Sequence, residues 1–185
     1  MWENNHHSGG PAKVSRPYYK DYIRDIPDWP KPGVVFRDIT PLLGDPSVFS
    51  TAIDTIARRF SNEDIVTVAG IEARGFVIGA ALSYALGTGF VPIRKTGKLP
   101  SKTVSSSYVG EYNGNVLEMH SDAIARGQRV LLVDDLIATG GSAAAAHDLI
   151  IKAGGIVVCV AILVELTQFN GRSRLNCPVY SLVQY

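Results

Sequence analysis

Apolar residues along this chain follow two patterns that alternate from one segment to the next. Three segments have the three-to-four-residue spacing, or the start and stop signals, of helices. Five others are short apolar runs, and the continuous run at 129–133 is typical of a strand covered on both faces. The alternation predicts an α/β fold with a central, mainly parallel sheet flanked by helices. The expected helices are 46–60, 75–86 and 142–152, and the expected strands are 65–71, 90–94, 129–133, 156–166 and 179–183.

Two polar stretches interrupt this pattern. Residues 1–17 are rich in Gly, Pro and His without an apolar period, which predicts a disordered tail. Residues 96–115 are rich in Ser and Gly and long for a plain connection, which predicts a mobile loop with a function of its own. Between the tail and the first long helix, a short helix is expected at 18–26, followed by an irregular proline-containing segment. The remaining length, 18–185, suits a single domain with one core.

Composition favours a small-molecule partner. The 185 residues include 18 basic and 17 acidic ones, a net charge of +1, so charge gives no reason to expect a nucleic acid or a membrane surface. Cys159 and Cys177 stand in or beside apolar runs, which indicates buried thiols in a reducing compartment. The longest apolar stretch, 156–166, is roughly half of the about 20 residues that a spanning helix needs. Without a leader pattern, we expect a cytoplasmic protein.

The acid pair Asp134-Asp135 directly follows the most continuous apolar run. In an open parallel sheet, ligands bind at the carboxyl ends of the strands, so both carboxylates are expected at the binding edge. Two carboxylates in such a place repel one another unless a ligand or a metal shares them, which argues against a purely structural helix cap. They are candidate acceptors for sugar hydroxyls.

A turn of small residues follows, Ala138-Thr139-Gly140-Gly141-Ser142, and then a helix. The glycines let successive amide groups point inward, the helix adds its positive end, and Thr139 and Ser142 add hydroxyl donors. The sequence therefore predicts a cradle for a phosphate monoester beside the acid pair. Neither Gly-x-x-x-x-Gly-Lys nor Gly-x-Gly-x-x-Gly after a strand is present, which argues against an ATPase or a dinucleotide-dependent dehydrogenase.

Together, residues 130–142 resemble the phosphoribosyl pyrophosphate signature of the type I phosphoribosyltransferases. Residues 27–39, 70–76, 94–100 and 108–112 resemble segments of the adenine branch of that family, the last of them its catalytic loop. The resemblance extends over about 25–185. It departs from the family pattern at Ser142, where threonine is common, and in the serine-rich stretch 101–107.

The resemblance implies transfer of a phosphoribosyl group to adenine, which yields AMP and pyrophosphate, with Mg²⁺ as cofactor and a homodimer as the assembly. Asp134 and Asp135 would bind the ribose hydroxyls directly or through a magnesium shell, and residues 138–142 the 5′-phosphate. Magnesium would be held through pyrophosphate and water, and Asp134 is the candidate direct ligand.

For pyrophosphate, the resemblance implies Arg74, Arg94 and Lys98, and it makes Arg94 a candidate to reach across a dimer interface. It also implies a cis peptide bond between Glu72 and Ala73 that turns backbone amides toward pyrophosphate. The alternative for the basic residues is an ordinary solvated surface.

For the base, the family pattern implies a small N-terminal hood at about 18–40, in which Val35, Phe36 and Arg37 contact adenine; the alternative is that the apolar pair is only core. In the loop at 96–115, Glu111 would act as general acid or base on the five-membered ring, and Tyr112 would pack over the leaving group. A solvated loop glutamate is the alternative.

Two other functions remain open from the sequence. A phosphoribosyltransferase for hypoxanthine, guanine, xanthine or orotate would keep every phosphate-binding feature and change only the hood. A regulatory protein that senses phosphoribosyl pyrophosphate is less favoured, because such a protein would be expected to carry a DNA-binding helix pair or a basic arm, and the first 17 residues have neither.

Overall fold

A computed structural model describes residues 18–110 and 113–185 of the chain. The chain divides into two compact units, one ending at Thr51 and one formed by Ala52–Tyr185. Helix α2 (Pro46–Phe60) begins in the first unit and ends in the second. The single domain expected over 18–185 stays a prediction.

The second unit is built on a sheet of seven strands in the described part of the chain, in the order β5-β6-β4-β3-β7-β8-β9. Pairing is parallel from β4 across to β9, whereas β6 pairs antiparallel with both β4 and β5. The prediction of a mainly parallel central sheet is therefore confirmed. The strands are β3 (Thr67–Ile71), β4 (Gly89–Lys95), β5 (Thr103–Gly110), β6 (Asn113–His120), β7 (Arg129–Ile137), β8 (Ile156–Glu165) and β9 (Val179–Gln184).

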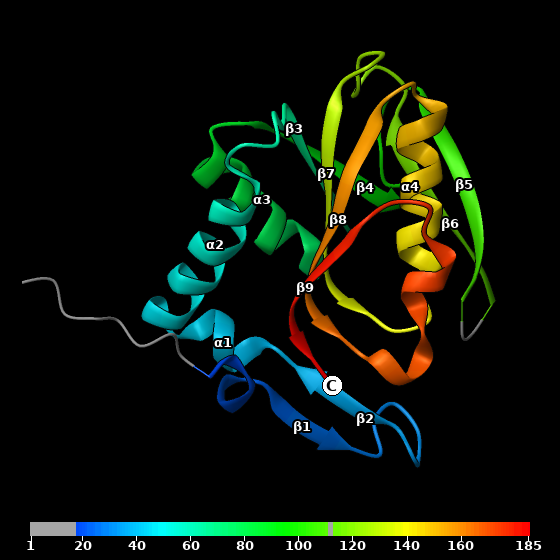
Figure 1. Cartoon of the computed structure of the whole chain (residues 1–185). Coiled ribbons are helices and arrows are strands. Elements are labelled where there is room, and N and C mark those ends of the chain that lie inside the picture. The colour runs from blue at the N-terminus through cyan, green and yellow to red at the C-terminus, as the bar shows by residue number, and fades with distance from the viewer. Residues whose placement is uncertain (1–17, 111–112) are drawn as a thin grey trace, which may run out of the picture. The chain divides into compact units, whose positions relative to one another are not determined.

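Helices cover both faces of this sheet (Figure 1). Helix α4 (Gly141–Lys152) packs on β7 and β8 and on the β5–β6 hairpin, and the small side chains of Ala143, Ala145 and Ala146 are buried there. Helix α3 (Arg74–Leu86) packs on β3, β4 and β7, and Figure 1 shows it on the other face. Strands β3 and β7 are almost fully buried, as expected for strands covered on both sides.

The chain order reverses at β3. Strand β4 follows β3 on one side of it, whereas β7, β8 and β9 extend the sheet on the other side. Ligands of open α/β sheets bind outside the carboxyl ends of the strands at such a switch point. The fold therefore places the ends of β3 and β7 where a substrate site is expected.

The first unit holds a two-stranded hairpin, β1 (Arg24–Pro27) and β2 (Val35–Asp38), between the 3₁₀ turn η1 (Tyr19–Tyr22) and helix α1 (Thr40–Gly44). The helix predicted at 18–26 is thus wrong beyond its first turn. Its second half becomes a strand because Ile26 has a partner, Phe36, ten residues further along the chain. Spacing within a short segment cannot reveal such a pairing.

The stretch 96–115, predicted to be a mobile loop, is largely a pair of strands in its described part. Residues 103–110 and 113–115 belong to the β5–β6 hairpin, in which Thr103 pairs with His120 and Gly110 with Asn113.

Among residues 18–110 and 113–185, no helix is long and apolar enough to cross a lipid bilayer.

Candidate active site

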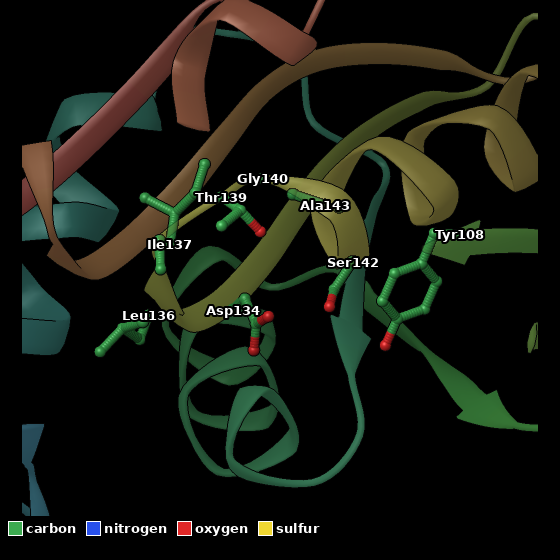
Figure 2. A pocket seen from close by; sticks show the side chains of 10 residues that line it. Tyr108, Asp134, Leu136, Ile137, Thr139, Gly140, Ser142 and Ala143 are labelled. Carbon is green, nitrogen blue, oxygen red and sulfur yellow. The ribbon is translucent and has the colours of Figure 1, made fainter. Parts of the chain in front are cut away.

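A pocket of about 260 Å³ lies at the carboxyl end of β7. The pocket is lined by Asp134, the first acid of the pair, and by the entire turn of small residues that was predicted to bind a phosphate (Figure 2). Figure 2 shows Asp134 and Ser142 beside the same opening, with Tyr108 of β5 on its far side. The residues around it are Tyr108, Asp134, Leu136, Ile137, Ala138, Thr139, Gly140, Gly141, Ser142 and Ala143.

The acid pair is buried, because β7 continues through it to Ile137. Asp134 and Asp135 are only 9% and 5% exposed. Burial raises the pKa of Asp134 well above its ordinary value, and the neighbouring charge of Asp135 raises it further. Burial also raises the pKa of Asp135, although Arg74 opposes this shift. Burial makes the charged form of these carboxylates unfavourable. Groups that donate hydrogen bonds to them, such as ribose hydroxyls, would therefore stabilise the charged form.

The turn has the backbone geometry that a phosphate cradle requires. Gly140 has φ of 78°, in the left-handed region that glycine adopts most readily, and it immediately precedes the first residue of α4. The first amide groups of a helix have no acceptor within the helix, so the amides at the start of α4 are available to an anion. The three buried alanines of α4, Ala143, Ala145 and Ala146, let this end of the helix lie close to the sheet.

Arg74 is held against the acid pair. It begins α3, just beyond the end of β3, and its Nε lies 2.7 Å from Oδ2 of Asp135. The guanidinium is 42% exposed, so it can reach a ligand while it neutralises the carboxylate. The structure thereby joins two residues that are 61 positions apart in the sequence.

A second cluster forms around Glu72, at the end of β3. Its carboxylate accepts hydrogen bonds from Nε of Arg94 (3.1 Å), from Nζ of Lys98 (2.5 Å) and from the Lys95 amide (3.1 Å). Burial alone would raise the pKa of Glu72, but these donors together lower it. The bond between Glu72 and Ala73 is cis, as the family resemblance implied. The three basic residues expected at pyrophosphate are therefore all at this edge of the sheet, and each is paired with a carboxylate.

The three residues expected at the base lie in succession on β2 of the first unit. Val35 is 44% exposed, whereas Phe36 and Arg37 are partly buried. Phe36 contacts Trp29 edge-to-face at 4.5 Å between ring centroids, and Arg37 pairs with Asp25 of β1. Since successive residues of a strand face opposite sides, Val35 and Arg37 share one side and Phe36 the other.

Sequence reasoning left Tyr108 out of the site. The Tyr108 side chain extends from β5 to the pocket, although Tyr108 lies outside the sequence segment that contains the acid pair and the turn (Figure 2). The sequence pattern that could have indicated its inward position is the alternation of Val104, Ser106 and Tyr108 on one side of the strand. The serines make this alternation hard to recognise. The predicted catalytic residues Glu111 and Tyr112 lie outside the described residues, between Gly110 and Asn113.

Comparison with known proteins agrees with this geometry. The sequence profile of the phosphoribosyl transferase domain matches residues 44–180, a span that includes the pocket. The adenine phosphoribosyltransferase of Methylobacterium nodulans is 53% identical over 169 residues, which are 90% of this chain and 93% of that protein. The chain belongs to the adenine phosphoribosyltransferase family.

Crystal structures of the family have the same fold. The adenine phosphoribosyltransferase of Rhodothermus marinus superposes with a TM-score of 0.86 at 48% identity, over 90% of this chain and 96% of that one. The Saccharomyces cerevisiae enzyme, crystallised with adenine and an imino-altritol bisphosphate, gives 0.86 at 38% identity, over 89% and 96%.

Proposed function

We propose that this protein transfers the phosphoribosyl group of phosphoribosyl pyrophosphate to adenine, and so produces AMP and pyrophosphate in purine salvage. The observation that carries the proposal is a pocket in which Asp134, the first acid of a buried pair, adjoins a glycine turn at the start of a helix. A sugar phosphate presents hydroxyls to the carboxylate and phosphate oxygens to the glycine turn. Cytoplasmic location stays a prediction from the sequence.

The ribose 5-phosphate part of the substrate fits this pocket. Asp134 and Asp135 would accept hydrogen bonds from the ribose hydroxyls, which explains why two carboxylates are kept in a buried place. Residues 138–142 would hold the 5′-phosphate through backbone amides and the hydroxyls of Thr139 and Ser142.

The pyrophosphate group would be bound by the basic residues around Glu72, namely Arg74, Arg94 and Lys98. In the free protein these residues are paired with Glu72 or Asp135. Pyrophosphate carries more negative charge than a single carboxylate, so it competes well for the same donors. Side-chain exposures of 42%, 33% and 47% leave each of them accessible to the ligand.

The donor set also suits Mg²⁺ bound together with the substrate. No group of three His, Cys, Asp or Glu side chains that could hold a metal alone occurs in residues 18–110 and 113–185. Magnesium is usually bound by one or two carboxylates, water and substrate phosphates, and Asp134 with Asp135 supplies such a pair. When bound, the ion would neutralise charge on the pyrophosphate group.

In the reaction, the bond from ribose C1′ to the pyrophosphate oxygen breaks, and a bond from C1′ to a nitrogen of the five-membered ring of adenine forms. Positive charge develops on the ribose ring as pyrophosphate departs, and the guanidinium of Arg74 helps to stabilise the leaving group. The ring nitrogen loses its proton in the process. We assign the transfer of that proton to Glu111 as general base, with Tyr112 packed over the leaving group to exclude water.

Base selectivity would come from the hood strand β2. Backbone groups of Val35 and Arg37 would pair with the amino-bearing edge of adenine, and an apolar side chain would pack on the ring. A site that accepts a hydrogen bond from an amine leaves its acceptor unpaired when a carbonyl takes that place, so oxopurines would bind poorly.

A homodimer is supported by an apolar strip on helix α3. Val77 is 46% exposed and Tyr84 is 91% exposed, and both lie on a helix whose sequence has no charged residue after Arg74. Val77 and Tyr84 are two helical turns apart, so their exposed side chains lie on the same side of α3, and exposed apolar groups that share a side are found at protein interfaces. Arg94 would contribute to a partner's site only if it released Glu72, to which it is bonded here.

The proposal is tested by measuring initial rates with phosphoribosyl pyrophosphate, Mg²⁺ and a panel of free bases. We expect rapid formation of AMP from adenine, and rates lower by about a hundredfold or more with hypoxanthine, guanine, xanthine or orotate. A preference for one of the other bases would contradict the assignment of the hood while leaving the phosphate site intact. Tight binding without turnover of any base would indicate a sensor instead of an enzyme.

A further inference from the structure

Besides the acid pair, a third buried carboxylate lies at the same sheet edge and has no part in the mechanism above. Glu165 ends β8, is 4% exposed, and pairs in register with Ile137 of the pocket. Its two oxygens accept hydrogen bonds from Nε and Nη2 of Arg172, both at 2.5 Å. Ser181 and Gln184 of β9 donate to the same carboxylate at 2.6 and 3.2 Å. Arg172 holds the pKa of Glu165 below its ordinary value, so the pair is charged at neutral pH.

Arg172 is fixed by more than this pair. Its Nη1 donates to the carbonyl oxygen of Val179 at 2.7 Å, and its Nη2 also donates to Ser181 at 2.8 Å. One guanidinium thus joins β8, β9 and the short turn η3 (Gly171–Arg174) on which it sits. A side chain with this many directed bonds determines where the backbone of η3 lies.

The residue before Arg172 touches the phosphate-binding turn directly. A Cβ atom at Gly140 would overlap the carbonyl oxygen of Gly171, and a Cβ at Gly171 would lie 2.9 Å from the amide nitrogen of Gly140. It would also overlap the carbonyl oxygen of Ala138. The two backbones are therefore in contact without any side chain between them, and Gly171 packs directly against the turn.

We propose that the Glu165–Arg172 pair is a positioning device for the 5′-phosphate site, in which Arg172 holds Gly171 against the turn formed by residues 138–140. The inference rests on the proposed function, because it needs the turn to bind a phosphate. Moving Gly171 by a fraction of an ångström shifts the amides of the turn with it, since nothing between the two can absorb the movement. Arg172 does not contact the substrate, so its effect is indirect.

If the Glu165–Arg172 pair only stabilised the fold, its loss would lower the free energy of unfolding without affecting one substrate more than the other. Arg129 offers a matched control, because it is 40% exposed where Arg172 is 39% exposed. It donates two hydrogen bonds to the carbonyl oxygen of Glu63, at 3.0 and 2.8 Å, at the opposite end of β7. Its loss should destabilise the fold without disturbing the turn.

The test compares Arg172→Gln, Arg172→Lys and Arg129→Gln by steady-state kinetics in both substrates and by thermal unfolding. We expect Arg172→Gln to raise KM for phosphoribosyl pyrophosphate about tenfold or more, with KM for adenine changed less than about twofold. Arg172→Lys should recover part of the loss, because it keeps the charge but not the bidentate geometry. Arg129→Gln should lower Tm and leave both KM values unchanged.

Equal changes in both KM values, or an unchanged KM for phosphoribosyl pyrophosphate in folded Arg172→Gln, would overturn the inference. If that variant does not fold, Glu165→Gln decides, because it keeps the shape of the acceptor and removes its charge; the same selective rise in KM is expected. Failure of the wild-type protein to bind phosphoribosyl pyrophosphate would instead contradict the proposed function, independently of Arg172.

Discussion

At the scale of single residues, the site depends on carboxylates that the fold holds in unfavourable surroundings. Asp134 has its pKa raised by burial and by Asp135, which means that the native state binds a proton more tightly than the unfolded chain does. The penalty for its charge is absent below the ordinary value of 3.8 and grows as pH rises through the native pKa. Each unit of such a shift corresponds to about 1.4 kcal/mol.

Replacing Asp134 by Asn should therefore stabilise the free protein and impair its function. We expect a higher free energy of unfolding at pH 7, and a weaker fall of stability as the pH rises above the ordinary value of 3.8. Affinity for phosphoribosyl pyrophosphate should fall about ten- to a hundredfold, as bonds to a charged acceptor are lost. Denaturant unfolding at several pH values and a binding titration measure both effects. A variant less stable than wild type at pH 7 would contradict this account of the acid pair.

At the scale of elements, strands β5 and β6 pair antiparallel up to Gly110 and Asn113, and Glu111 stands between these two residues in the sequence. Because we assign proton transfer to Glu111, Glu111→Gln should lower kcat about a hundredfold or more, with little change in KM for phosphoribosyl pyrophosphate. Asp122→Asn, which alters an exposed carboxyl just after β6, should leave kcat unchanged. Unaltered turnover in Glu111→Gln would remove this glutamate from the mechanism.

The hairpin also shows what sequence patterns miss. In β5, Val104 and Tyr108 pack on the core and Ser106 is 7% exposed, so every second residue faces inward. The alternation is that of a strand, but serine at an inward position hides it and suggests a loop. Serine suits this position because the small alanine side chains of α4 allow the helix to pack closely on β5, and a small inward side chain on the strand suits such close packing.

The phosphate site was more predictable than the hairpin. The acid pair, the glycine turn and the helix are contiguous in the sequence, so local chemistry was enough to define them. The pairing of Arg74 with Asp135, the Glu72 cluster and the contact of Gly171 with Gly140 join residues far apart in the chain. Only the order of strands in the sheet brings these residues together, and no spacing in the sequence records that order.

At the scale of the whole molecule, the exposed strip on α3 predicts self-association. Val77→Glu combined with Tyr84→Glu places two like charges on each copy of that strip, and should convert a dimer into a monomer. Ile151→Glu is a matched control, since Ile151 is 49% exposed on α4, and should leave the dimer intact. Sedimentation equilibrium measures the masses. A wild-type monomer, or a double variant that remains dimeric, would contradict this interface.

The central claim is that the acid pair and the glycine turn together bind the sugar phosphate, and a calorimetric titration with phosphoribosyl pyrophosphate and Mg²⁺ tests it most directly. We expect saturable binding by the wild type and its loss in Gly140→Ala, where a Cβ would overlap Gly171. Gly87→Ala is the control, because Gly87 also has a positive φ, 66°, but nothing lies near its Cβ position; this variant should bind as the wild type does. Absence of binding by well-folded wild-type protein, or equal binding by folded Gly140→Ala, would contradict the account.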